Sequence, residues 1–219
     1  MTARRTLPPT ASVAQAGDGA KLHAPSAERN AGPITDALAD IAPAAGSALE
    51  LASGTGQHVV AFARAMPGLD WQPTEIDPVR RASIDAHAAE AGLGNLRAAL
   101  ALDATARGWG ARHGGQAMVV LVNLLHLIGT PEARTLIEEA AQALMPGGYL
   151  ALYGPFLRDG KATSEGDARF DASLRAQDLG IGYKDLAEVT RWLNAAGLTA
   201  PERRDMPANN LLLVARRPG

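Results

Sequence analysis

The chain of 219 residues contains no cysteine. This absence excludes disulfide bridges, cysteine-ligated zinc, cysteine-held iron–sulfur clusters and cysteine nucleophiles. It is also typical of chains that work in a reducing compartment, so we expect a cytoplasmic protein. Long hydrophobic runs are missing as well, because no apolar stretch approaches the roughly 20 residues of a membrane-spanning helix.

An excess of charge of one sign is also missing. The chain has 21 Lys and Arg against 23 Asp and Glu, and its formal net charge is −2. Such a balance gives no bulk attraction to nucleic acid or to anionic membranes. With 47% hydrophobic residues, the chain has the composition of one ordinary globular domain. We therefore expect a small-molecule partner, and the sequence gives no oligomeric state.

The first residues lack the apolar periodicity of the rest. They contain Pro8-Pro9 and Gly17-Asp18-Gly19, and no apolar core of signal-peptide length follows Arg4 and Arg5. We expect a disordered tail over residues 1–24 and one domain over residues 25–219. A transit peptide is the alternative interpretation of the tail.

Strand-like and helix-like segments alternate along that domain. The expected strands are 48–51, 69–75, 96–102, 117–121, 149–153 and 211–215, with a further strand between 198 and 206. The expected helices are 26–41, 58–65, 77–91, 131–144 and 184–196, whereas residues 154–182 have no clear period. This alternation predicts an α/β fold with a mostly parallel sheet and helices on both faces. In such folds ligands bind at the carboxyl ends of the strands.

A glycine-rich turn follows the first expected strand and precedes a helix. It is the run Ser53-Gly54-Thr55-Gly56. The glycines let the backbone approach a ligand closely, and the free N–H groups of the helix start point toward it. A dinucleotide site wants a third glycine three residues later, where this chain has Val59. The match to a dinucleotide site is therefore only partial.

S-adenosylmethionine fits the corner better, because it has no pyrophosphate. Glu50 is positioned for its ammonium group, Glu75 for both ribose hydroxyls, Asp103 for the adenine amino group and Asn123 for the methionine part. Other residues of the turn, of the strand ends and of the first helix complete the expected cofactor site. They are Arg29, Asn30, Ala52, Ser53, Gly54, Thr55, Gly56, His58, Ile76, Leu102 and Ala104.

The order of these motifs resembles class I methyltransferases over about residues 25–217. The narrower resemblance is to an uncharacterised methyltransferase-like family, long known as a domain of unknown function, which includes methyltransferase-like protein 26. It rests on the runs 26–30, 52–58, 71–73, 152–156, 170–175 and 206–211. It implies a Rossmann-like sheet of seven strands with the last one antiparallel, S-adenosylmethionine as cofactor, and no known substrate. Ala52, in place of a glycine, and the run 176–185 depart from the pattern.

Methyl transfer is a displacement at an activated carbon, so positioning supplies most of the rate and a base is optional. His126, just after the fourth strand, is the candidate base; a loop histidine held by a backbone carbonyl is the competing interpretation. Tyr153 is the second candidate at the reaction centre, although it can equally be a packing residue. The acceptor pocket is expected to include Glu28, Phe156, Arg175, Asn209 and Asn210. The histidines have no metal-site spacing, so we expect no metal.

The sequence thus predicts a methyltransferase domain that transfers a methyl group to oxygen or nitrogen of a small or medium-sized acceptor. Asn123-Leu124-Leu125-His126 differs from the Asn-Pro-Pro-aromatic run of amine methyltransferases that act on adenine or glutamine. Three alternatives stay open. They are a non-catalytic cofactor-binding protein on the same fold, a nicotinamide-dependent oxidoreductase, and a methyltransferase that acts on a protein side chain.

Overall fold

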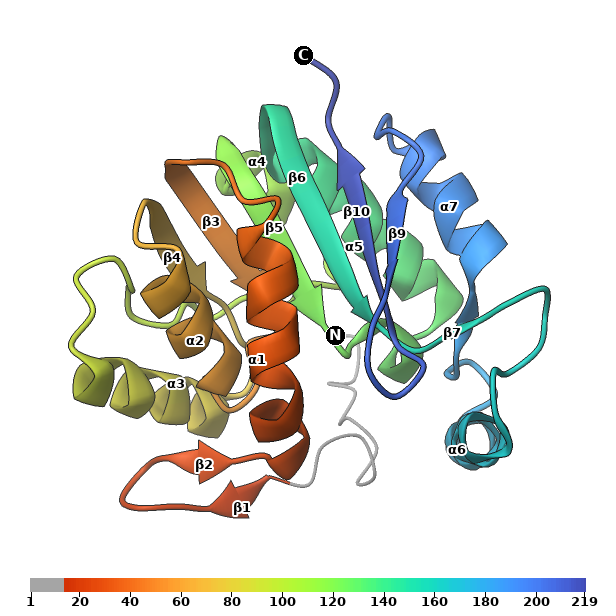
Figure 1. Cartoon of the computed structure of the whole chain (residues 1–219), viewed down its shortest axis with the longest axis horizontal. Coiled ribbons are helices and arrows are strands. Elements are labelled where there is room, and N and C mark those ends of the chain that lie inside the picture. Colours follow the sequence, from red (N-terminus) through yellow and green to blue (C-terminus); the bar gives the residue numbers. More distant parts are fainter. Residues whose placement is uncertain (1–13) are drawn as a thin grey trace.

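A six-stranded sheet forms the centre of the computed structural model, which describes residues 14–219 (Figure 1). The strand order is β4-β3-β5-β6-β10-β9. The first four run parallel, and they are β3 (Gly46–Leu51), β4 (Leu69–Pro73), β5 (Gln116–Val122) and β6 (Leu144–Gly154). The last strand, β10 (Leu211–Arg216), is antiparallel to β6 and to β9 (Glu202–Asp205). The predicted parallel sheet with an antiparallel last strand is confirmed.

The seventh strand, expected over residues 96–102, differs from the prediction. This segment makes only isolated parallel bridges, from Leu96 to Trp71 in β4 and from Leu100 to Thr74 just after β4. Pro73, the last residue of β4, has no N–H to donate to a continuous ladder. The side-chain amide of Gln72 donates instead to the Ala98 carbonyl, at 2.7 Å. The edge position is therefore filled by irregular chain.

Helices cover both faces of the sheet, as the alternation predicts. One face carries α1 (Pro25–Ala39), α2 (Gln57–Ala65) and α3 (Pro78–Ala91). The other carries α4 (Trp109–Arg112), α5 (Thr130–Ala143) and α7 (Leu186–Ala195). Successive residues of β5 alternate between the two apolar cores, with Met118 and Val120 on the α1 side and Val119 and Leu121 on the α5 side. A strand buried on both faces accounts for the continuous apolar run.

The segment without clear periodicity contains a helix, α6 (Glu165–Gln177). Ser164 caps this helix, because its side chain accepts from the Asp167 N–H. The helix was not predicted because Leu174 is its one fully buried residue. A small parallel pair, β7 (Phe156–Leu157) with β8 (Lys184–Asp185), and a 3₁₀ turn, η1 (Leu125–Leu127), complete this end of the molecule.

The expected disordered tail is ordered from residue 14 onward, and residues 1–13 lie outside the described part. β1 (Gln15–Ala16) and β2 (Leu22–His23) form a hairpin beneath α1 and α3 (Figure 1). The Ser83 hydroxyl accepts from the Leu22 N–H at 2.7 Å, and the Leu22 carbonyl contacts the His87 ring at 2.9 Å. Hydrogen bonds to α3, rather than apolar burial, hold this hairpin, so a search for apolar periodicity misses it.

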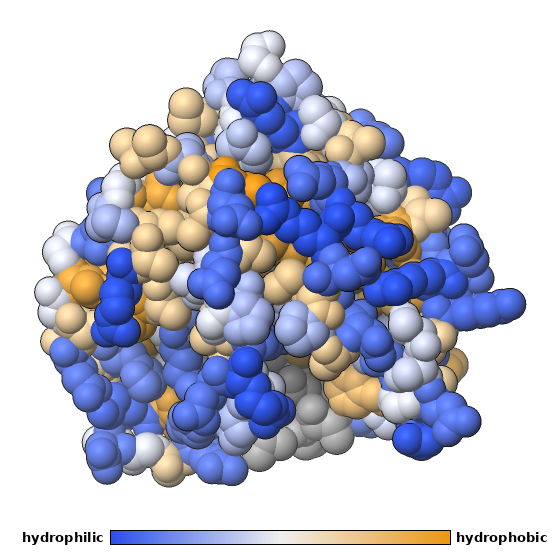
Figure 2. Space-filling view, viewed as in Figure 1, coloured by the Kyte–Doolittle hydropathy of each residue, from blue (hydrophilic) through white to orange (hydrophobic). Residues whose placement is uncertain are grey.

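Charged residues protect the exposed edge of the sheet. Figure 2 shows hydrophilic side chains gathered over the edge of the sheet where β9 lies, and all four residues of β9 are charged. Charges on an edge strand hinder its pairing with another chain. In the part of the chain that the structure describes, no helix has both the length and the apolarity required to cross a membrane.

Candidate functional site

The carboxyl ends of the parallel strands meet at one edge of the sheet. In the strand register Glu50 is level with Pro73 of β4 and Val120 of β5, and Val122 is level with Tyr153 of β6. Asn123, just past β5, has φ 56° and donates its N–H to the Tyr153 carbonyl at 2.9 Å. The residues predicted from separate strand ends therefore lie along one edge.

The glycine turn connects β3 to α2 through left-handed backbone. Ala52, Gly54 and Gly56 have φ values of 50°, 60° and 95°. A Cβ on Gly56 would lie 2.8 Å from the Ile84 Cα, so this glycine allows α2 and α3 to pack closely. A Cβ on Gly54 would meet nothing nearer than an Arg80 nitrogen at 3.9 Å. The space beside Gly54 is therefore open, as a bound ligand requires.

Glu50 is the most unusual side chain of this edge. Only 1% of it is exposed, and its Oε2 atom has no hydrogen-bond partner among the described residues. Burial raises the pKa of Glu50 to about 8, and the nearby Glu75 charge adds to this, whereas a hydrogen bond with Ser53 opposes it. A buried carboxyl group with an unused oxygen is suited to receive a cationic partner.

Glu75 is also buried, but both of its carboxylate oxygens have partners in the turn. Its Oε2 accepts from the Gly54 N–H at 3.0 Å, and its Oε1 accepts from the N–H groups of Ile76 and Asp77 at 2.8 and 3.2 Å. Arg81 donates to the carbonyls of Glu75 and Ile76. A carboxylate has about four acceptor sites, so Glu75 keeps capacity for a further donor while it orders the turn.

Asp103 lies in an exposed turn beyond the irregular edge segment. Its Oδ1 accepts from the Thr105 N–H and hydroxyl, at 2.9 and 2.6 Å. Its neighbours Leu102 and Ala104 are buried. The Asp103 carboxylate, held by its own turn, can therefore accept a hydrogen bond between two apolar residues. An aromatic amine such as adenine requires this combination.

A polar chain runs from α2 across α1 to β6. The Asn30 Oδ1 lies 2.7 Å from His58 Nε2, and Asn30 and Asn210 both hydrogen-bond to Tyr153. Burial lowers the pKa of His58 to about 4, so its ring is neutral near pH 7. Burial also raises the pKa of Tyr153, against the two asparagine bonds. Tyr153 is therefore a neutral phenol at the strand edge, beside two asparagines.

His126 lies in η1 and is 5% exposed. Its ring makes edge contacts with Phe170 and Tyr183, at centroid distances of 6.0 and 5.9 Å. Burial, and then the Lys184 charge, lower the pKa of His126 to about 3, against a smaller opposing effect of Asp171. A ring of so low a pKa is neutral at pH 7 and a weak proton acceptor.

Several other predicted residues already have partners. Glu28 pairs with His23 at 3.2 Å, and Asn209 donates to Asp167 at 3.0 Å. Arg175 pairs with Asp171, and Phe156 is buried in the apolar core. Arg29 is exposed on α1. Of the five residues expected around the acceptor, Asn210 is the one with a described hydrogen bond to Tyr153.

Two residues that the sequence analysis did not single out support the glycine turn. Gln57 Oε1 accepts from the Thr55 hydroxyl at 2.9 Å and from the Ala24 N–H at 2.7 Å. The Ser83 hydroxyl donates to the Thr55 carbonyl at 2.8 Å. The role of Gln57 could have been predicted, because Gln57 follows the turn directly. The role of Ser83 could not, because no motif links this residue of α3 to the turn. Among residues 14–219 no group of three His, Asp or Glu side chains is arranged to hold a metal.

Solved structures with this fold include several methyltransferases. An O-methyltransferase family protein from Burkholderia thailandensis has a TM-score of 0.77 and 21% identity, over 89% of this chain and 58% of that one. Human N-acetylserotonin methyltransferase in complex with SAM has a TM-score of 0.73 and 14% identity, over 89% of this chain and 53% of that one. The chain spans little more than half the length of these proteins. It has the Rossmann-like fold of the methyltransferases.

An O-methyltransferase family 2 protein from Planctomyces limnophilus, in complex with apigenin, is similar in the same way. Its TM-score is 0.72 at 21% identity, over 87% of this chain and 59% of that chain. A family of proteins of unknown function, DUF938, matches residues 21–217. This match covers the sheet, all of its helices and the whole candidate site, and so the chain belongs to the DUF938 family.

Proposed function

We propose that residues 25–219 form an S-adenosylmethionine-dependent methyltransferase, acting on an oxygen or nitrogen of a small or medium-sized acceptor. The cysteine-free composition leads us to place it in the cytoplasm. The narrower resemblance to the methyltransferase-like protein 26 family belongs to the same proposal.

One observation carries the proposal. Glu50 is a fully buried carboxyl group whose Oε2 lacks a partner among the described residues, and it stands beside a glycine turn with open space at Gly54. Buried polar atoms are almost always hydrogen-bonded, so an unused carboxyl oxygen indicates a ligand group. The ammonium group of S-adenosylmethionine supplies both the donors and the positive charge that this oxygen lacks.

The neighbouring residues fit the other parts of the cofactor. Glu75 would accept the ribose hydroxyls with its remaining acceptor sites, and Asp103 would accept the adenine amino group between Leu102 and Ala104. Asn123 would lie beside the methionine part. The cofactor supplies a methyl group already activated on a sulfonium sulfur. The work left to the chain is to hold the acceptor in line with that group.

Tyr153 and Asn210 are the proposed acceptor contacts. The Tyr153 side chain interacts with Asn30 and Asn210 at the same edge as Asn123, so its hydroxyl is placed to hydrogen-bond an acceptor. His126 is still the candidate base. Because burial lowers the pKa of its ring, however, it is too weak a base to remove a proton from an unactivated alcohol. We therefore propose that positioning supplies most of the rate.

The structural neighbours do not decide between an oxygen and a nitrogen acceptor. Two of the three described above are O-methyltransferase family proteins. Their acceptors are not carried over, because identities of 21% and coverage of little more than half of each neighbour relate the folds only. The oxidoreductase alternative is disfavoured by Val59, which is fully buried in the core where a dinucleotide fold needs glycine.

Isothermal titration calorimetry with S-adenosylmethionine and with NADH tests the cofactor directly. We expect binding of the former and none of the latter. A screen of metabolite extracts with methyl-labelled cofactor then tests transfer. Binding without label transfer to any acceptor would favour the non-catalytic alternative, and tight NADH binding would overturn the proposal.

A further inference from the structure

Hydrogen bonds join the glycine turn to the β1–β2 hairpin, and all of them pass through Thr55. This residue stands between Gly54 and Gly56, whose φ values are 60° and 95°. Because glycine has the greatest backbone freedom, contacts from outside the turn have to fix its shape. Thr55 is 4% exposed, and its hydroxyl and its carbonyl both have partners outside the turn.

The first connection runs through Ser83 of α3. Its hydroxyl donates to the Thr55 carbonyl at 2.8 Å and accepts from the Leu22 N–H of β2 at 2.7 Å. The same hydroxyl is thus a donor toward the turn and an acceptor toward the hairpin, an arrangement in which each bond polarises the other. Ser83 is fully buried, so water would not replace a lost hydroxyl.

The second connection runs through Gln57, the first residue of α2. Its Oε1 accepts from the Thr55 hydroxyl at 2.9 Å and from the Ala24 N–H at 2.7 Å. Its Nε2 lies 3.2 Å from His23 Nδ1. Residues 22–24 therefore each contact Ser83 or Gln57, and both of these side chains bond to Thr55.

The hairpin depends on these contacts for its own order. β1 and β2 have two residues each, and an isolated two-stranded hairpin is at best marginally stable in water. β1 is exposed, and both residues of β2 are only partly buried. A further bond to α3 joins the Leu22 carbonyl to the His87 ring, at 2.9 Å. Order in the hairpin and order in the turn therefore support each other.

We propose that the β1–β2 hairpin is part of the cofactor site, with Ser83 and Gln57 as positioning residues that fix the glycine turn for its ligand. This rests on the proposed function, because S-adenosylmethionine is the ligand assigned to the turn. Coupling between two sites is reciprocal. A turn held by the hairpin binds the cofactor more tightly, and bound cofactor in return stabilises the hairpin.

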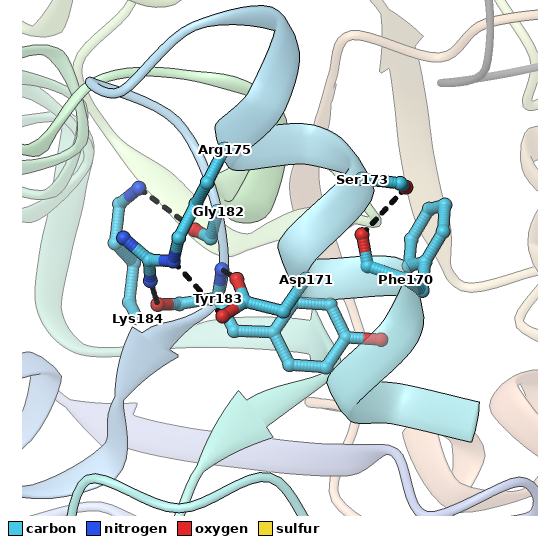
Figure 3. A network of polar contacts seen from close by, with 7 residues as sticks. All are labelled: Phe170, Asp171, Ser173, Arg175, Gly182, Tyr183 and Lys184. Carbon is cyan, nitrogen blue, oxygen red and sulfur yellow. Dashed lines mark hydrogen bonds and ion pairs between the residues drawn. The ribbon is translucent and has the colours of Figure 1, made fainter. Parts of the chain in front are cut away.

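Helix α6 offers a matched control for each positioning residue. Figure 3 shows the Ser173 hydroxyl bonded to the Phe170 carbonyl, at 2.7 Å, in a network that includes no residue of the turn or the hairpin. Gln177 donates to the Ser173 carbonyl at 3.0 Å. Ser83→Ala and Gln57→Met are therefore the connection variants, and Ser173→Ala and Gln177→Met are the α6 controls.

Amide hydrogen exchange of the full chain, without cofactor, tests whether the hairpin fixes the turn. The Gly54 N–H donates to the Glu75 carboxylate at 3.0 Å. The Gly56 N–H donates to the Ser53 carbonyl at 3.1 Å. The connection variants leave both acceptors in place, so faster exchange at the two glycines reports a loosened turn. We expect an increase of about fivefold or more, the effect of one lost hydrogen bond, and no change in the α6 controls.

The amides of β5 serve as the reference for a general loss of stability, and circular dichroism checks that each variant folds. Gln57 is half-buried, so Gln57→Met carries the test if Ser83→Ala does not fold. Unchanged exchange at Gly54 and Gly56 in a folded connection variant would overturn the proposal.

Calorimetry with S-adenosylmethionine tests the consequence for the ligand. We expect the connection variants to bind it about fivefold or more weakly than the wild-type chain, and the α6 controls to bind it equally. In the wild-type chain, saturating cofactor should slow exchange at Leu22 and Ala24 by about the same factor and leave the amides of α7 unchanged.

Equal affinity in folded connection variants would overturn the proposal. Absence of binding to the wild-type chain would instead refute the proposed function, and the exchange rates of the ligand-free variants would still decide whether the hairpin fixes the turn.

Discussion

Glu50 and Glu75 stand at the same strand edge, yet only Glu75 has hydrogen-bond partners for both of its carboxylate oxygens. Glu75 accepts three backbone N–H bonds, from Gly54, Ile76 and Asp77. Glu50 is buried with an unused oxygen, and its pKa rises to about 8. Near pH 7 the free protein therefore holds Glu50 as a neutral acid, and a cationic ligand would favour its ionised form.

The first prediction concerns stability and pH in the ligand-free protein. Because the folded pKa of Glu50 is raised, its contribution to stability is present at low pH and is lost as pH rises toward 8. Between pH 6.5 and 8 we expect the free energy of unfolding to fall by up to about 1.4 kcal/mol per pH unit. Glu50→Gln should abolish this slope in urea unfolding, whereas Glu165→Gln, on the exposed side of α6, should keep it. A slope that persists in Glu50→Gln would assign it to another group.

The second prediction concerns the cofactor. Glu75→Ala removes the proposed acceptor of the ribose hydroxyls and also frees the N–H groups that order the turn. We expect the binding free energy of S-adenosylmethionine to weaken by roughly 1–3 kcal/mol, the usual cost of removing a buried hydrogen-bond partner. Calorimetry measures the affinity, and Asp159→Ala, on an exposed loop, serves as the control. Unchanged affinity in Glu75→Ala would refute the ribose assignment.

At the scale of elements, α4 is fixed to α5 through a glycine and a buried acid. Glu139 of α5 accepts from the N–H groups of Gly108 and Gly110, at 2.8 and 2.7 Å. A Cβ on Gly110 would lie 2.3 Å from the Glu139 carbonyl oxygen and 3.0 Å from the Gln142 Cβ. Gly110 thus allows the two helices to approach closely enough for the acid to reach both N–H groups.

The third prediction tests this contact. Gly110→Ala should destabilise the fold by about 1–3 kcal/mol, because the new methyl group meets backbone that has no room to move. Gly114→Ala is a matched control four residues away, where the nearest atom would be 3.7 Å from the new Cβ. Urea unfolding of both variants measures the difference. Equal stability of the two variants would mean that the helices can separate at little cost.

The elements also indicate what a single sequence can predict. The run 117–121 was recognisable as a strand, because burial on both faces leaves a continuous apolar signature. The edge segment 96–102 was expected to be a regular strand. It is irregular because Pro73 of the neighbouring strand β4 lacks an N–H for the ladder, and the sequence of 96–102 itself does not show this. Helix α6 was missed because a helix with little buried surface has little periodicity to read.

At the scale of the whole molecule, some features of the site were predictable from the sequence and others depend on residues far away in the chain. Glu50, Glu75 and Asn123 were predictable as neighbours, because strand ends of a parallel sheet meet at one edge. The burial of His126 was not predictable, because Phe170 and Tyr183 reach it from α6 and from the loop after it. Asn209 and Arg175 were expected near the acceptor but have partners within or beside α6.

The fourth prediction concerns acid sensitivity of the whole fold. Burial lowers the folded pKa values of His58 and His126 to about 4 and 3, so the unfolded chain binds protons below pH 6.5 that the folded chain refuses. Stability should therefore fall from pH 6.5 to 5, by up to about 1.4 kcal/mol per pH unit for each histidine. Urea unfolding of Glu50→Gln isolates this effect from that of Glu50, and adding His58→Gln should reduce the slope. A flat profile over this range would contradict the assignment.

The hairpin of β1 and β2 links the first described residues to the glycine turn through Gln57 and Ser83. Since the chain has no cysteine, Asp18→Cys in the exposed hairpin loop would create a single thiol and accept a single fluorescent label. That label would sit at the far end of a short run of hydrogen bonds from Thr55. Binding and release of the proposed cofactor could then be timed by fluorescence with the candidate site itself left unmodified, before any acceptor is known.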